Sequence, residues 1–301
     1  NTYAGRTQID LNGLLNIAGP GSIAASSGVT NDGTFDISRA WNPVSIRDLG
    51  GSGKIYLGAQ NLSITNADNG TFSGTIADAG GSYNVAGGSL SLTGGRLTLT
   101  GANTYTGGTA ATGGAILRIN ADAALGNTSG GLTLNNGMLA ALSNFTMARQ
   151  VTLGAGGGAF DTNGFDLTLG TAVTGAGGLA KRGSGILTLS GASSYAGGTT
   201  VNAGTLQLAP GASLPTTGPL AVNGGTLDLN GNNLAIGSLS GLGGRIELGS
   251  GILTVAGQSN TSFAGILAGT GGLTMRGPGA LSLAGANTYT GDTTVAGGTL
   301  R

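Results

Sequence analysis

Short runs in which apolar and polar residues alternate recur along the whole chain. Clear examples are Ile186–Ser190, Thr205–Leu208, Thr226–Leu229 and Ile246–Leu248. This period of two predicts β-strands with one buried face. Gly-Gly, Asn-Gly and Ser-Gly pairs separate the runs and supply the positive backbone angles that tight corners need. Because no segment places apolar residues at helical spacing over a useful length, the chain is predicted to be all-β.

One block of sequence returns almost unchanged. Residues 187–206 read LTLSGASSYAGGTTVNAGTL, and residues 281–300 read LSLAGANTYTGDTTVAGGTL. A degenerate copy occupies 97–117, and a truncated copy opens the chain near 1–15. Each copy is marked by one tyrosine: Tyr3, Tyr105, Tyr195 and Tyr289. The chain starts inside one copy and stops inside another, so we expect it to be a piece of a longer polypeptide.

The distance between copies predicts the architecture. An interval of about 90 residues is too long for one turn of a solenoid, so each interval should hold several turns, or rungs, of about 20 to 25 residues. Glycine accounts for 64 of the 301 residues, without the period of three and the abundant proline of collagen. We therefore predict a right-handed parallel β-helix, a solenoid that forms one continuous body over residues 1–301.

Composition excludes several classes of function. Charged residues make up only 8% of the chain, and the 12 basic residues balance the 12 acidic ones. No electrostatic footprint for nucleic acid is present, so nucleic acid is not an expected partner. The chain has neither histidine nor cysteine, which removes Ser-His-Asp triads, thiol nucleophiles and histidine-ligated zinc. We predict no catalytic residue, no metal site and no cofactor.

The repeated block resembles the passenger-associated transport repeat of bacterial autotransporters. Two copies match along their whole length, each after a lead-in ending in Gly-x-Gly, at Leu179–Gly185 and Leu273–Gly279. The copy at 97–117 departs after Thr109, where Ala110 and the next alanine replace Thr-Val. The wider sequence style covers most of residues 85–301.

The resemblance implies a passenger domain at the cell surface or outer membrane of a Gram-negative bacterium, or secreted from it. It implies a C-terminal outer-membrane β-barrel in the same polypeptide, and repeats that assist secretion and folding. Passengers of this kind are often adhesins, so host-cell surface or matrix components are expected partners, and self-association is a further expectation. Two alternatives stay open: an inert spacer that carries an upstream protease or toxin domain, and a polysaccharide-active β-helix enzyme.

Paired carboxylates are the enzymatic pattern that composition allows. Asp161 and Asp166 flank a Thr-Asn-Gly-Phe segment, and Asp228 occupies the matching place in a second copy of the corner. We interpret the shared Asp-x-Asn-Gly element as a turn whose side chains bond their own backbone. The repeat tyrosines are expected to pack over corners of their own rungs. Lys181, Arg182 and Arg276 are expected to be solvated corner charges.

Residues 32–54 break the bland pattern. Six charged residues lie there beside Trp41, the only tryptophan of the chain. Tryptophan and arginine are enriched at interaction hot spots, so this segment is a candidate insertion with a partner-binding surface. The candidate residues are Arg39, Trp41, Arg47 and Lys54. The alternative is a surface loop closed by local ion pairs.

Overall fold

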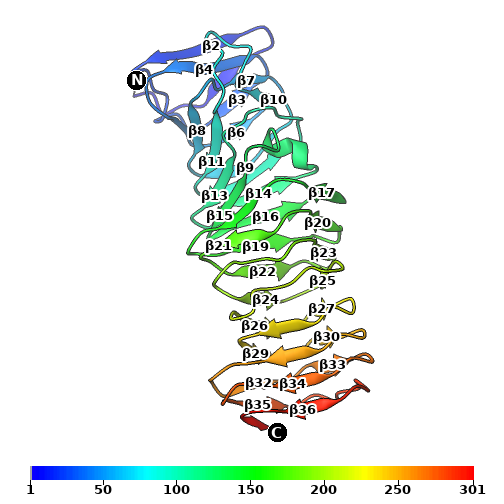
Figure 1. Ribbon diagram of the computed structural model, residues 1–301. Coiled ribbons are helices and arrows are strands. Elements are labelled where there is room, and N and C mark those ends of the chain that lie inside the picture. Colours follow the sequence, from blue (N-terminus) through cyan, green and yellow to red (C-terminus); the bar gives the residue numbers. More distant parts are fainter. Residues whose placement is uncertain (1) are drawn as a thin grey trace. The chain divides into compact units, whose positions relative to one another are not determined.

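The computed structural model of the protein describes residues 2–301, so the first residue of the opening repeat copy lies outside the described part (Figure 1). Short parallel strands dominate it, and the helical content of residues 2–301 is limited to one 3-10 turn, η1 (Asp122–Leu125). Contacts divide the chain into two compact units, the first ending at Val151 and the second beginning at Thr152. In each unit, strands pair in parallel with strands one rung later, which confirms the predicted parallel β-solenoid.

The first unit contains four ladders of parallel strands, together with strand β17. The strands are β1 (Thr7–Ile9), β3 (Val29–Asn31) and β6 (Leu49–Gly50); β2 (Leu14–Gly19), β4 (Thr34–Ala40), β7 (Lys54–Tyr56) and β10 (Thr75–Ala77); β5 (Val44–Ile46), β8 (Asn61–Ile64), β11 (Ser89–Leu92), β13 (Thr109–Thr112) and β15 (Leu132–Asn135); β9 (Ala67–Phe72), β12 (Gly95–Leu99), β14 (Ile116–Ile119) and β16 (Gly137–Ala141); and β17 (Phe145–Met147).

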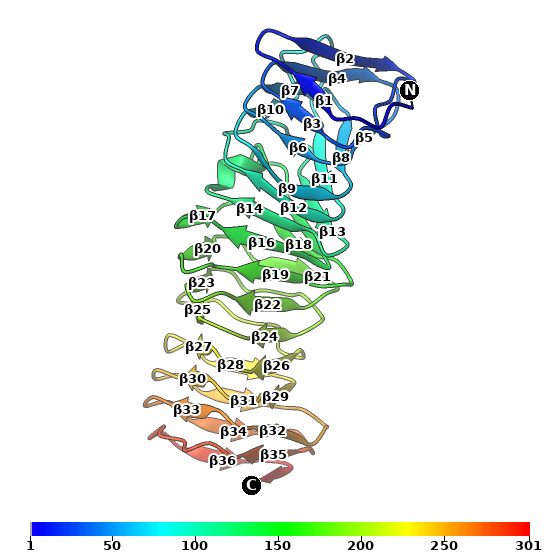
Figure 2. The same ribbon diagram turned by 180° about the vertical axis from the view of Figure 1, so that it is seen from behind.

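The second unit repeats the same plan with shorter strands, which stack one above another in both views (Figures 1 and 2). The strands are β18 (Val151–Leu153) and β21 (Val173–Gly175); β19 (Gly158–Asp161), β22 (Leu179–Arg182), β24 (Thr199–Val201), β26 (Pro219–Val222) and β29 (Ser238–Ser240); β20 (Leu167–Leu169), β23 (Ile186–Leu189), β25 (Thr205–Leu208), β27 (Thr226–Asp228), β30 (Arg245–Glu247) and β33 (Ile266–Ala268); β28 (Leu234–Ile236), β31 (Leu253–Val255), β34 (Leu273–Met275) and β36 (Thr293–Val295); and β32 (Thr261–Phe263), β35 (Ala280–Leu283) and β37 (Thr299–Leu300).

The core of the second unit is a set of aliphatic stacks that run from rung to rung. In one stack Leu187 pairs with Leu206, which pairs with Leu227, followed by Ile246 and Leu267. Partners are 19 to 21 residues apart, for example 187 to 206 and 206 to 227, near the lower end of the expected rung length. All five side chains are fully buried. Each contributes roughly 1.5 to 3 kcal/mol of hydrophobic free energy.

Glycine is required where the rungs meet at corners. A Cβ atom at Gly185, the last residue of a repeat lead-in, would lie 1.8 Å from the carbonyl oxygen of Phe165 in the preceding rung. A Cβ at Gly279, the equivalent residue of the other full copy, would lie 2.4 Å from the carbonyl oxygen of Ser259. Both distances are shorter than any real contact of this kind. The Gly-x-Gly lead-in therefore allows consecutive rungs to superpose.

Each repeat tyrosine bonds to a threonine four residues later. The distance between the hydroxyl oxygens is 2.6 Å for Tyr105 and Thr109 and 2.6 Å for Tyr195 and Thr199. Tyr289 makes the same bond to its threonine at 2.7 Å, but nearer to solvent. Tyr105 and Tyr195 are fully buried, and burial raises the pKa of both hydroxyls far above their ordinary value. This places the tyrosines at corners of their own rungs, as expected.

Lys181 is not the solvated corner charge that we expected, although Arg182 and Arg276 are exposed. Its side chain is fully buried because strand β22 turns it inward with Leu179, in line with Phe160 and Val201 of the neighbouring rungs. Burial lowers the pKa of Lys181 to about 8, against a smaller opposing effect of Asp161. The Nζ atom donates to the Thr162 hydroxyl at 2.9 Å and to the carbonyl oxygens of Arg182, Gly183 and Ala203 at 2.8, 2.8 and 3.1 Å.

Replacing Tyr195 by phenylalanine should destabilise the second unit by about 1 kcal/mol, because the buried Thr199 hydroxyl loses its partner. The matched Tyr289→Phe change should cost much less, since its hydrogen bond is accessible to water. Urea unfolding followed by far-ultraviolet circular dichroism measures both. Equal effects of the two changes would contradict the role assigned to the buried bond.

The stability of the protein should rise between about pH 8 and pH 10 because of Lys181. In that range the unfolded chain keeps the lysine proton, whose ordinary pKa is 10.5, while the folded chain releases it at about 8. The free energy of unfolding should increase by roughly 2 to 3 kcal/mol relative to Lys181→Met over this interval. Methionine occupies the matching position 275. Parallel pH profiles for the two proteins would show that Lys181 does not titrate in the folded core.

Candidate functional site

Residues 32–54 are part of the solenoid. They are not the inserted loop that their composition suggested. Strand β4 pairs with β2 and β7, and β5 pairs with β8 of the next rung. The apolar residues of the segment account for this arrangement, since Phe35, Ile37, Val44, Ile46 and Leu49 are all buried. The charged residues of the segment are therefore carried on strands and corners of regular rungs.

Two of the four candidate contact residues lie together. Arg39 is the penultimate residue of β4, and Trp41 follows the strand directly. Both line a groove of about 510 Å³ in the first unit. Arg47 and Lys54 are also exposed, but they do not line it. The structure thus brings together Arg39 and Trp41 and leaves the other two outside the groove.

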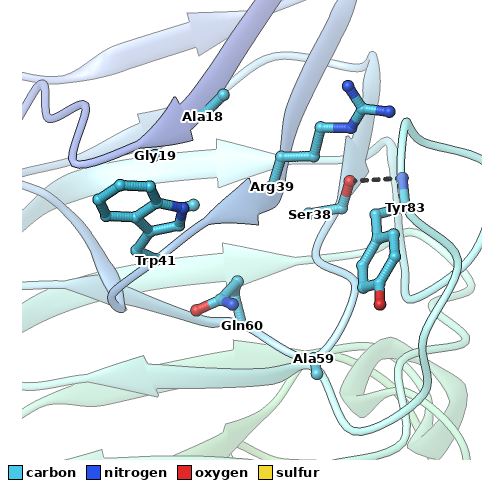
Figure 3. Close-up of a pocket in the computed structure, with 9 residues that line it drawn as sticks. Ala18, Gly19, Ser38, Arg39, Trp41, Ala59, Gln60 and Tyr83 are labelled. Carbon is cyan, nitrogen blue, oxygen red and sulfur yellow. Dashed lines mark hydrogen bonds between the residues drawn. The ribbon is translucent and has the colours of Figure 1, made fainter.

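The groove has lining residues that sequence reasoning did not identify. Ser38 belongs to β4, Gln60 precedes β8, and Tyr83 comes from the long corner between β10 and β11 (Figure 3). Three alanines and one glycine complete the lining: Ala18, Gly19, Ala40 and Ala59. Trp41 is 76% exposed and Tyr83 is 58% exposed. Two exposed aromatic side chains at one site are unusual on a chain in which aromatic residues make up only 4%.

The corner that carries Tyr83 is fastened to β4 by a buried carboxylate. Asp36 accepts hydrogen bonds from the backbone nitrogens of Ser38 at 2.9 Å and Ser82 at 2.7 Å. Burial on its own raises the pKa of Asp36, but the hydrogen bonds of Ser38 and Ser82 outweigh it and leave this pKa below the ordinary value. The Ser38 hydroxyl also accepts from the Tyr83 nitrogen at 2.9 Å. The wall that holds Tyr83 is thus positioned by β4 itself.

A second carboxylate holds the two ends of the same corner. Asp78 Oδ2 accepts from the Gly87 nitrogen at 3.1 Å, and from the nitrogen and hydroxyl of Thr106 at 3.1 and 2.6 Å. Within the corner, the Gly80 nitrogen donates to Asn84 Oδ1 at 2.7 Å. Both anchors act on backbone amides, so the corner has a defined position without an apolar core of its own.

The candidate acids of the second unit stabilise tight turns of the backbone. Asp161 Oδ1 accepts from the Asn163 nitrogen at 2.9 Å, and Asp228 Oδ1 accepts from the Asn230 nitrogen at 2.8 Å. Both asparagines have positive φ values, as the Asp-x-Asn-Gly corner requires. The turn interpretation is therefore confirmed. Within residues 2–301, no group of three or more acidic residues is arranged to hold a metal ion.

Comparison with known proteins gives the family. The passenger-associated-transport-repeat family matches residues 94–119, 179–208 and 273–301, which contain the blocks read from the sequence at 97–117, 187–206 and 281–300. A relative from Brucella suis biovar 1 (strain 1330), the adhesin BmaC autotransporter, is 34% identical over 278 residues. The chain belongs to the autotransporter passengers that carry these repeats.

The aligned region covers 85% of this chain but only 8% of the Brucella relative, so the chain corresponds to a small part of a very long protein. No solved structure is significantly similar to it. As an autotransporter passenger, the chain is located at the cell surface or outer membrane of a Gram-negative bacterium, or is secreted. Among residues 2–301 there is no helix with the length and hydrophobicity needed to cross a bilayer.

Changing Asp36 to alanine should release the corner that carries Tyr83. Two backbone amides lose their acceptor, so amide hydrogen exchange at Ser82 should become about tenfold faster or more, equivalent to roughly 1.4 kcal/mol. In the unchanged protein this protection should be present above the ordinary carboxyl pKa of 3.8 and be lost as the pH falls through the lower folded value. Exchange at Leu187, in the second unit, serves as the control. Unchanged exchange at Ser82 would show that Asp36 does not hold the corner.

Proposed function

We propose that this chain is an adhesive segment of the passenger stalk and that the groove between Trp41 and Tyr83 is its contact surface. The observation that carries the proposal is the groove itself, where two exposed aromatic rings lie beside an arginine on a weakly charged solenoid. Exposed aromatic and arginine side chains in a concave site are typical of binding hot spots. The relative from Brucella suis, named as an adhesin, supports the same conclusion.

The proposed role is structural and not enzymatic. The chain has no histidine or cysteine. The acids that most resemble a catalytic pair are used elsewhere: Asp166 accepts from the Ile186 nitrogen at 3.1 Å, and Asp228 accepts from Gln207 at 2.8 Å as well as from its own turn. Carboxylates committed to backbone and amide donors support a role in shaping rungs.

The partners proposed for the groove are components of the host-cell surface or matrix. We further propose that the polypeptide continues to a C-terminal outer-membrane β-barrel, as in other autotransporters, and that the repeats help the passenger to fold and leave the cell. The bonds of Tyr105, Tyr195 and Tyr289 support the last point, because each closes a corner within five residues. Such local closure costs little loop entropy while the chain is still emerging.

Binding to cultured host cells and immobilised matrix proteins tests the adhesive role. The purified 301-residue chain should bind saturably, and an Arg39→Ala, Trp41→Ala double variant should lose about 2 kcal/mol of binding free energy or more, because both groove anchors are removed. An Arg47→Ala, Lys54→Ala double variant is the matched control, because it removes two exposed cations outside the groove. Absence of binding by the unchanged chain would make it a spacer, and equal loss in both variants would place the contact outside the groove.

A further inference from the structure

The groove between Trp41 and Tyr83 has the chemistry of a saccharide site. Its volume of about 510 Å³ lies in the range of small-molecule sites. The two rings lie on opposite sides of an opening whose floor carries Gln60, with Arg39 above it (Figure 3). An aromatic face is electron-rich and packs against the polarised C–H groups on the apolar face of a sugar ring. Two such faces around one amide suit a ring that is apolar on its faces and polar at its edge.

The position of Trp41 is set by the backbone beneath it. Its nitrogen donates to the Gly19 carbonyl oxygen at 2.8 Å, which fixes the chain as it leaves β4. A Cβ atom at Gly19 would lie 3.8 Å from Cε2 of the indole, so the ring lies beside this residue. The indole is therefore next to the backbone at the end of β2, while 76% of the side chain stays open to solvent. An indole exposed to this extent has ring surface available for stacking.

The polar groups of the groove are available to a ligand. Arg39 forms no ion pair within residues 2–301, and its hydrogen bond from Nη2 to the Ser82 carbonyl oxygen is long, at 3.5 Å. The Gln60 amide makes no side-chain hydrogen bond in the same part of the chain and offers both a donor and an acceptor. A sugar hydroxyl needs both functions, since it donates and accepts.

The charge of the groove selects for a carboxylate. Arg39 is the one charged residue among those lining it, and no acid lines it. The nearby Asp36 is buried, and its oxygens accept from Ser38, Ser82 and Asn16. A guanidinium presents paired N–H donors that match the two oxygens of a carboxylate. The aliphatic lining consists of alanines, whose small side chains offer little apolar area to the large anchors of a protein partner.

We propose that this groove binds a saccharide that carries a carboxylate, stacked between Trp41 and Tyr83 with its acid group on Arg39. The proposal rests on the proposed adhesive function and names the class of ligand that the adhesive surface recognises. Terminal uronic acids and other acidic sugars share the required chemistry.

Trp41 is the only tryptophan, so its fluorescence reports on the groove directly. A disaccharide with a terminal glucuronate should change the emission of the 301-residue chain saturably. The matched disaccharide with terminal glucose should bind at least about tenfold more weakly. Arg39→Gln should bring the two sugars to equal, weak affinity, and Tyr83→Ala should weaken both. Arg47→Ala should change neither. Each variant is first shown to unfold at the same urea concentration as the parent.

The proposal is overturned if the acidic and neutral sugars bind equally, if neither binds, if only a sulfated analogue binds, or if Arg39→Gln leaves the preference intact. The same proteins are tested for binding to host cells with the acidic disaccharide as competitor. Groove-dependent cell binding without saccharide binding would refute the ligand class and leave the adhesive role standing. Saccharide binding without cell binding would refute the adhesive role and leave the ligand class standing.

Discussion

Parallel pairing between equivalent strands one rung apart is the constraint on which the rest of each unit depends. Such strands lie about 4.8 Å apart, so every rung must reproduce the path of its neighbour at every corner. Side chains that point inward then form stacks such as the one through Leu187 and Leu206. Residues at the closest approaches, such as Gly185, have no room for a Cβ atom. Glycine content, strand alternation and repeat spacing are three consequences of the same geometry.

The same constraint makes buried polar groups expensive, and each unit satisfies its corners differently. Arg149 in the first unit donates to five backbone carbonyl oxygens around η1, and its Nε lies 2.6 Å from Asp122 Oδ1. Lys181 in the second unit performs the equivalent task with a single nitrogen. Corners leave carbonyls without strand partners, and an unsatisfied buried carbonyl costs about 1 to 3 kcal/mol. A buried cation with several acceptors offsets that cost at several carbonyls together.

Sequence reasoning reached the fold because the fold is periodic. Alternation and the twenty-residue block were sufficient to predict parallel rungs, and the Asp161 and Asp228 corners followed from local turn chemistry. Lys181 was misplaced because its residue type was weighed above its position, although it shares the parity of the buried Leu179. Tyr83 was missed for a different reason. It lies 42 residues after Trp41, and no local pattern indicates that a corner between β10 and β11 packs beside the end of β4.

The groove lies beside a place where rung length changes sharply. Leu62 pairs with Leu90, 28 residues later, whereas Leu90 pairs with Thr109 after only 19. Rungs of equal length superpose, so extra residues in one rung must leave the path that its neighbours share. Here the surplus forms the corner that carries Tyr83, and Asp36 and Asp78 hold it against the solenoid. The pairing of β2 with β4 shifts register between Asn16 and Ala18, and Ala18 lines the same groove. In a repetitive passenger, departures from the repeat are therefore the places where a specific contact can be built.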